Sequence, residues 1–244
     1  MDYFKVIDER LKKRYDNPNT LLEQIFNSVL KRNGKRLRPL LFLALSEDFA
    51  LEINENILSI AESIEYFHLS SLIHDDLPAV DNDDYRDGSL TIHKIYGEGN
   101  ALYAGIYLSY LGLDLISKVN LDIIPYALKA LQGIIRGQLL DINEPLNKDI
   151  SKYKTGELFA FVFSLPLLLN NNLEYLDVMA DFGLKLGEYY QYQDDTFDKK
   201  KNDYQEIDLI FEYEKLTKDL IMKKVMKKNT NSLKILLQIV KRNY

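Results

Sequence analysis

Two acidic clusters in the chain each follow an apolar stripe of helical period. The first, Ser71-Leu-Ile-His-Asp-Asp-Leu-Pro-Ala-Val-Asp-Asn-Asp-Asp-Tyr-Arg-Asp-Gly88, holds six aspartates. The second, Gln191-Tyr-Gln-Asp-Asp-Thr-Phe-Asp198, places Asp194 and Asp198 at positions i and i+4, on one helical face. Clustered carboxylates suit Mg²⁺, which also accepts water and substrate phosphate as ligands. One such cluster is usually a solvated acidic turn, but two clusters at the ends of apolar stripes predict a site for metal and phosphate.

The first cluster needs a break in its helix to act as a single site. Asp75 and Asp81 are six residues apart, and six residues turn an ideal helix by about 600°, so the two side chains would not share a face. Pro78 lies between them and disfavours the helical conformation of the residue before it. We therefore expect the helix to end near Pro78 and a turn to bring both carboxylates to one ion.

Basic residues that could contact a metal-bound anion occur in three places. They are the segments Gly34-Lys-Arg-Leu-Arg-Pro39 and Tyr153-Lys-Thr-Gly156 and the single residue Arg86. The first segment, taken alone, is more typical of an exposed basic start to a helix over residues 39–44. In combination with the acidic clusters, these residues favour a phosphate-containing substrate.

The elements that position these residues are predicted to be helices. Apolar residues recur at three- and four-residue steps, which is the period of an amphipathic helix. Two such stripes are Ile57, Ile60, Ala61, Ile64, Phe67, His68 and Ser71, and Met179, Phe182, Gly183, Leu186, Tyr189, Tyr190 and Gln193. We find no hairpin dipeptide flanked by alternating residues. The sequence predicts an all-α fold, with residues 1–244 as one domain.

The composition excludes several classes of protein. The 244 residues include no cysteine, which excludes disulfides, and 31 Lys and Arg against 37 Asp and Glu give a net charge of −6, which disfavours nucleic-acid binding. The longest apolar run, residues 158–169, is shorter than the roughly 18–20 residues of a membrane helix and contains Ser164 and Pro166. We expect a cytoplasmic protein without a signal peptide or a transmembrane segment.

The segments and their order resemble the trans-isoprenyl diphosphate synthases, the family of farnesyl and geranylgeranyl diphosphate synthases. The matching segments span residues 34–198 and are Gly34–Pro39, Ser71–Pro78 with Asp81, Arg136–Asp141, Lys154–Phe159 and Tyr190–Asp198. The resemblance implies a single-domain bundle of antiparallel helices around a deep apolar cavity, usually assembled as a homodimer. It also implies a prenyltransferase that condenses isopentenyl diphosphate with an allylic diphosphate after Mg²⁺-triggered ionisation.

The resemblance assigns roles to individual residues. Asp75, Asp81 and Asp194 match the positions that bind Mg²⁺, three ions when diphosphate is bound, and Asp76, Asp195 and Asp198 match supporting positions. Positions that grip the allylic diphosphate are matched by Arg86, Lys154, Thr155 and Gln191, of which the last three are also the expected catalytic residues. Positions that hold isopentenyl diphosphate are matched by Lys35, Arg38 and His68.

Product length in the family depends on bulky residues upstream of Asp75. This chain has the small residues Ser70 and Ser71 there, with Phe67 a turn deeper as the expected floor. A geranylgeranyl (C20) product, or otherwise farnesyl diphosphate, is therefore expected.

Two departures from the family pattern keep other functions open. Asp87 stands where the family carries a second arginine that helps to bind isopentenyl diphosphate, and the glycine-rich loop with a phosphate-binding lysine is not recognisable after Asp198. One alternative is an enzyme of the class I terpene cyclase type, which ionises an allylic diphosphate without isopentenyl diphosphate. Another is a non-catalytic subunit that forms a heteromer with an active synthase.

Overall fold

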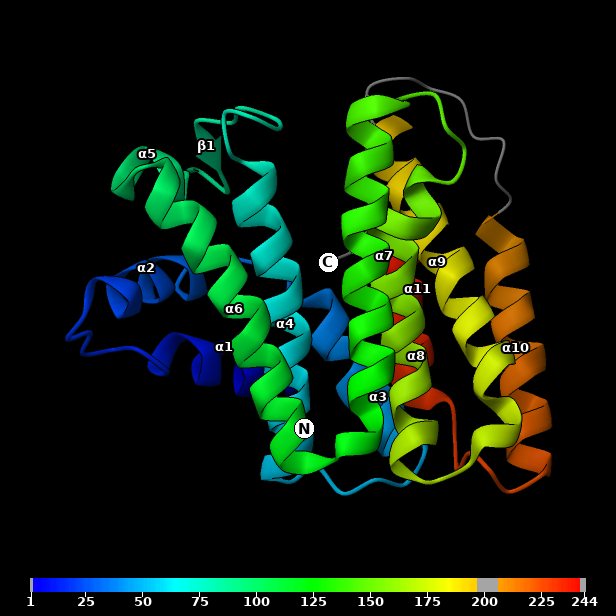
Figure 1. Cartoon of the computed structure of the whole chain (residues 1–244). Helices are drawn as coiled ribbons and strands as arrows, with labels where there is room; N and C mark the ends of the chain where they lie inside the picture. The colour runs from blue at the N-terminus through cyan, green and yellow to red at the C-terminus, as the bar shows by residue number, and fades with distance from the viewer. Residues whose placement is uncertain (1, 197–205, 242–244) are drawn as a thin grey trace.

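The computed structural model describes residues 2–196 and 206–241, with side chains for residues 2–193 and 209–241. This part of the chain is almost entirely helical, as the apolar periodicity predicted (Figure 1). The helices are α1 (Tyr3–Lys13), α2 (Leu21–Leu30), α3 (Leu37–Asp48), α4 (Glu55–Asp75), α5 (Ile92–Tyr96), α6 (Glu98–Val119), α7 (Ile124–Asn143), α8 (Glu157–Leu169), α9 (Leu176–Thr196), α10 (Glu206–Met222) and α11 (Thr230–Lys241). Shorter elements are the strands β1 (Tyr85–Arg86) and β2 (Ser89–Leu90), the 3₁₀ turns η1 (Leu121–Ile123) and η3 (Leu173–Tyr175), and the π-helical turn η2 (Lys152–Gly156).

Helices α3 and α8 supply the centre of the core. Both are apolar on all sides, and a helix of this kind must be surrounded by other elements. Phe42 on α3 and Phe163 on α8 are fully buried. Helix α3 contacts α4, α8 and α11, while α8 contacts α7 and α9. These two helices therefore join the part of the bundle that holds α4 and α6 to the part that holds α7, α9 and α10 (Figure 1).

The two predicted apolar stripes face this core. Ile60 and Phe67 on α4, and Phe182 and Leu186 on α9, are at most 1% exposed. Asn54 precedes helix α4 as its N-cap, and its side chain accepts hydrogen bonds from the backbone amides of the first turn. Asp75 is the last residue of α4, and Asp194 and Asp195 belong to the last turn of α9.

A small hairpin follows α4, although the sequence has no alternating pattern that indicates strands there. Strands β1 and β2 pair in antiparallel fashion, with Arg86 opposite Ser89. The Asp87-Gly88 dipeptide joins them with φ angles of 50° and 76°, which are the left-handed conformations of a type I′ turn. Each strand has only two residues, too few to show an alternating pattern, so the sequence carried no strand signal beside the turn.

The C-terminal helix is part of the bundle. Asp48 at the end of α3 is fully buried, and its carboxylate accepts hydrogen bonds from the Ser232 hydroxyl at 2.6 Å and the Ser232 amide at 2.8 Å. This contact attaches α11 to α3. None of the described helices combines the length and the hydrophobicity needed to span a membrane.

Candidate active site

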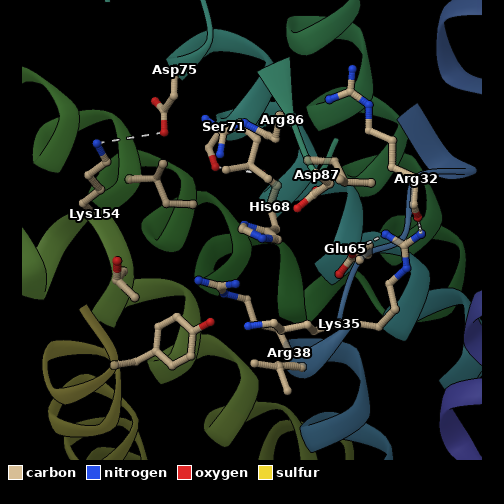
Figure 2. A pocket seen from close by; sticks show the side chains of 18 of the residues that line it. Arg32, Lys35, Arg38, Glu65, His68, Ser71, Asp75, Arg86, Asp87 and Lys154 are labelled. Carbon is tan, nitrogen blue, oxygen red and sulfur yellow. Dashed lines mark hydrogen bonds and ion pairs between the residues drawn. The ribbon is translucent and has the colours of Figure 1, made fainter. Parts of the chain in front are cut away.

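A pocket of about 410 Å³ gathers most of the predicted site residues (Figure 2). Its walls come from the α2–α3 loop, α4, the β1–β2 hairpin, α7, η2 and α9. The predicted residues that line it are Lys35, Arg38, His68, Ser71, Asp75, Arg86, Lys154, Thr155 and Gln191. Segments separated by more than 100 residues in the sequence therefore meet at one site.

The first acidic cluster forms a turn after α4, as the position of Pro78 led us to expect. Helix α4 ends at Asp75, and the chain turns back so that the Asp81 amide donates a hydrogen bond of 2.9 Å to the Asp75 carbonyl. The Asp75 side chain lines the pocket. Burial raises the pKa of Asp75 to about 6, the Lys154 ammonium opposes this rise, and the Asp81 carboxylate adds to it. A bound cation next to this carboxyl group would stabilise its charged form and lower its pKa.

Asp76 fixes the position of Arg86. The Asp76 residue is only 1% exposed, and its carboxylate accepts a hydrogen bond from Arg86 Nε. Asp83 accepts a weaker one, at 3.3 Å, from Arg86 Nη2. These contacts attach the hairpin to the end of α4 and hold the guanidinium of Arg86 at the pocket wall (Figure 2).

Lys154 and Thr155 project from a π-helical turn, a distortion that is frequent at functional sites. Lys154 Nζ lies 2.8 Å from the Asp141 carboxylate and 4.0 Å from the Asp75 carboxylate. Burial opposes the charge of Lys154, but the hydrogen bond to Asp141 and the charge of Asp75 leave its pKa raised. The Thr155 hydroxyl donates to Gln191 Oε1 at 2.7 Å, which joins η2 to α9.

Gly137 allows η2 to approach α7 closely. A Cβ atom at this position would lie 2.2 Å from the Lys154 backbone nitrogen, so any larger residue would displace the turn that presents Lys154.

Lys35, Arg38 and His68 form a second group of cationic or hydrogen-bonding side chains in the same pocket. The Arg38 guanidinium lies over the Phe159 ring, 4.9 Å from its centroid, in a cation–π contact. Removal from water and the charges of Arg38, Arg86 and Arg36 lower the pKa of His68 well below its ordinary value. His68 is therefore neutral at pH 7, with one ring N–H available as a donor.

Several lining residues were not predicted. Glu65, Arg32, Gln138 and Tyr190 line the pocket together with Asp87. Glu65 precedes His68 by three residues, so the helical period of the His68 stripe could have indicated it. The motif alone does not determine whether Asp87 faces the pocket, and the left-handed turn of the hairpin places it there (Figure 2).

Some predicted residues do not line the pocket. Phe67 is buried against the Phe161 ring and against the backbone of Gly112 on α6. The Ser70 hydroxyl contacts the Ser109 hydroxyl at 2.6 Å, again between α4 and α6. Asp81 is not among the lining residues of the pocket. The side chains of Asp194 and Asp195, and all of Asp198, lie outside the described residues.

The described residues fit one half of a Mg²⁺ site. Asp75 and Asp81 carry hard oxygen ligands, and a backbone hydrogen bond of 2.9 Å joins the two residues. Burial raises the pKa of Asp75, so a bound cation would stabilise its carboxylate. Within residues 2–193 and 209–241, no three His, Cys, Asp or Glu side chains are grouped closely enough to hold a metal ion. A complete metal site would therefore need ligands beyond these, and the second acidic cluster contains the expected one, Asp194.

Known proteins resemble this chain in sequence and in fold. The family model described as polyprenyl synthetase matches residues 19–242. A farnesyl diphosphate synthase of Micrococcus luteus is 33% identical over 213 residues, covering 81% of this chain and 73% of the relative. A geranylgeranyl diphosphate synthase of Cyanophora paradoxa is 33% identical over 215 residues, covering 80% and 71% of the respective chains. The crystal structure of a geranyltranstransferase from Thermotoga maritima has a TM-score of 0.79 and 28% identity over 98% of both chains. The chain therefore belongs to the polyprenyl synthetase family.

Proposed function

We propose that this protein is a Mg²⁺-dependent trans-prenyltransferase that joins isopentenyl diphosphate to an allylic diphosphate. The observation that carries the proposal is the shared pocket. It brings Lys35, Arg38 and His68 within the same 410 Å³ cavity as Lys154 and Asp75. Two groups of anion-binding side chains in one cavity fit a reaction between two diphosphates. The names of the relatives support this reaction.

The allylic diphosphate is proposed to bind at Arg86, Lys154, Thr155 and Gln191. The raised pKa of Lys154 keeps its ammonium charged, so it stabilises the negative charge that develops on the leaving diphosphate. When bound, three Mg²⁺ ions would supply further positive charge there, with Asp75, Asp81 and Asp194 as their protein ligands. The C–O bond of the allylic substrate then breaks and leaves an allylic cation.

Isopentenyl diphosphate is proposed to bind at Lys35, Arg38 and His68. Two cations and the neutral imidazole donor of His68 hold its diphosphate, so that its double bond faces the allylic carbon. The π electrons of the double bond form the new C–C bond, and the departing diphosphate accepts the proton that the acceptor loses. Apolar residues in the pocket wall, Leu69, Leu72 and Ile134, reduce access of water to the cation.

The product is proposed to be geranylgeranyl diphosphate (C20) or farnesyl diphosphate. The small residues Ser70 and Ser71 precede Asp75 by about one turn of α4, and Ser71 lines the pocket. Phe67 fills the space between α4 and Gly112 of α6 and would stop a growing chain there.

A homodimer is the proposed assembly. Two helices expose apolar side chains along one face each: Tyr103, Ile106, Tyr107 and Tyr110 on α6, and Leu128, Ile135, Leu139 and Ile142 on α7. Faces of this kind are typical of protein interfaces, which are rich in aromatic residues and poor in charge at their centre. Light scattering of the pure protein would show twice the mass of one chain. A monomer that binds only an active synthase would instead favour the heteromer.

Incubation of the pure protein with Mg²⁺ and farnesyl or geranyl diphosphate, with and without isopentenyl diphosphate, tests the function. We expect a longer prenyl diphosphate that forms only when isopentenyl diphosphate is present. A hydrocarbon or alcohol formed without isopentenyl diphosphate would indicate the cyclase-like reaction. The absence of any product would favour the non-catalytic subunit.

A further inference from the structure

Arg36 is the one basic residue of the 34–39 segment whose side chain is enclosed by protein. Its side chain is 1% exposed, whereas Lys35 is exposed and Arg38 is half-buried. Arg36 Nη1 donates to Glu65 Oε1 at 2.8 Å, and Nε donates to Asp8 Oδ1 at 3.3 Å. Nη2 donates to two backbone carbonyls, those of Leu30 at 2.9 Å and Arg32 at 2.8 Å. A buried guanidinium with this many partners holds them in a fixed arrangement.

The backbone of the loop is shaped around this side chain. Arg36 has a φ angle of 51°, a left-handed conformation that is uncommon for a residue with a Cβ atom. Gly34 lies against the guanidinium, because a Cβ atom there would be 2.7 Å from Arg36 Nη1. Leu30 is the last residue of α2, so the bond to its carbonyl also caps that helix. The conformation of the loop that carries Lys35 and leads into Arg38 at the start of α3 therefore depends on Arg36.

The two carboxylates attach this loop to two helices. Glu65 lies on α4, one turn before His68, and is 2% exposed. Asp8 lies on α1 and is 8% exposed. Its Oδ2 atom also forms an ion pair with Lys12 Nζ at 2.7 Å. The Arg36–Glu65 pair thus fixes Lys35 and Arg38 relative to His68, which is on the same helix as Glu65. The Arg36–Asp8 pair adds a support from α1, which precedes the region matched by the family model, residues 19–242.

We propose that Asp8, Arg36 and Glu65 position the isopentenyl diphosphate site and that α1 contributes to substrate affinity through Asp8. The inference rests on the proposed function of Lys35, Arg38 and His68. None of the three positioning residues is proposed to contact the reacting atoms. Their loss should therefore weaken binding of isopentenyl diphosphate and leave the allylic site intact, because Lys154, Thr155 and Gln191 are held by η2 and α9.

Steady-state kinetics of Arg36→Lys and Asp8→Asn test the proposal. Arg36→Lys keeps the positive charge but replaces the planar guanidinium and its several N–H donors with one ammonium group. Asp8→Asn keeps the shape of the side chain but removes its negative charge. We expect the KM for isopentenyl diphosphate to rise about tenfold in Arg36→Lys, equivalent to about 1.4 kcal/mol, and by a smaller factor in Asp8→Asn. The kcat and the KM for the allylic substrate should stay within about twofold of wild type. Equal changes in both KM values would overturn the proposal.

Arg10→Gln is the matched control. Arg10 also links α1 to α4, through Glu55 at 2.7 Å and Glu62 at 3.0 Å, but it has no contact with the loop. If its only role is structural, it should lower the melting temperature without a selective change in either KM. A selective rise in the KM for isopentenyl diphosphate in this control would contradict the role given to Asp8.

A binding measurement separates this inference from the proposed function. Isopentenyl diphosphate is titrated calorimetrically into wild type, Asp8→Asn and Arg10→Gln in EDTA. If wild type forms no condensation product, the proposed function fails by itself. Weaker binding to Asp8→Asn than to the other two proteins would still support the positioning role. Equal affinity for all three, or no binding to wild type, would refute it.

Discussion

The sequence shows that residue 87 is an aspartate, but only the fold shows that it lines the pocket. It stands where the family carries an arginine that helps to bind isopentenyl diphosphate, so a carboxylate that faces the pocket would weaken that site. The Asp87-Gly88 turn has φ angles of 50° and 76°, and Asp87 lines the pocket together with Lys35, Arg38 and His68. A carboxylate in this position repels a diphosphate.

Asp87→Asn should therefore improve binding of isopentenyl diphosphate. One unit of like charge at close range is worth about 1 kcal/mol in a water-exposed site, so the KM should fall about fivefold. Initial rates at saturating allylic substrate measure this change. Asp84→Asn, which removes a charge paired with Lys94 at 2.9 Å outside the pocket lining, is the control and should leave the KM unchanged. An unchanged KM in Asp87→Asn would show that the carboxylate does not affect the substrate.

The lowered pKa of His68 should make the stability of the protein depend on pH. Because its pKa is lowered in the folded protein from an ordinary value of 6.5, the unfolded chain binds more protons as pH falls below 6.5. The wild type should then lose up to about 1.4 kcal/mol of unfolding free energy per pH unit through this residue. His68→Gln removes that loss. Urea denaturation at pH 7 and pH 5.5 measures it, and parallel losses in both proteins would mean that His68 titrates normally.

At the scale of elements, helical period was sufficient to predict the stripes of α4 and α9 and the break after Asp75, because both depend on local spacing and on Pro78. The packing of η2 against α7 was not predictable from spacing, since it depends on the close approach that Gly137 permits. The same limit applies to Phe67. Its place on the stripe was predicted, but its contact with Gly112 comes from the packing of α6 against α4.

Phe67→Ala should lengthen the product by one or more five-carbon units. The substitution opens space between α4 and α6 next to Ser70, in the direction away from Asp75. Chromatography of the dephosphorylated products measures the chain length. Phe182→Ala, which removes an equally buried ring that contacts Phe163 and Tyr213, is the control and should leave the length unchanged. Identical products from Phe67→Ala and wild type would remove Phe67 from its proposed role.

At the scale of the whole molecule, all-α architecture followed from composition and period, whereas the attachment of α11 to α3 did not. Asp48 and Ser232 are 184 residues apart, and neither lies in a recognisable motif. The prediction that residues 1–244 form one domain implies that this contact belongs to the same cooperative unit as the site. A single unfolding transition would agree with it, and two separate transitions would not.

Ser232→Ala should destabilise the protein by about 2 kcal/mol, because a buried carboxylate loses a hydrogen bond. Chemical denaturation followed by circular dichroism measures the change. Ser117→Ala is the control, since the Ser117 hydroxyl donates only to the Asp114 carbonyl of its own helix, and it should change stability much less. Equal effects from the two substitutions would show that the Asp48 contact adds nothing to stability.

The central claim is that two acidic segments far apart in the sequence bind divalent cations together with a diphosphate. Titration of Mn²⁺, detected by electron paramagnetic resonance, tests it directly in the presence of a non-ionisable allylic thiolodiphosphate. Wild type should bind Mn²⁺ only when the analogue is present, and Asp75→Asn and Asp194→Asn should each lower the affinity at least about tenfold. Binding that is the same in wild type and in either variant would contradict the shared site and, with it, the proposed chemistry.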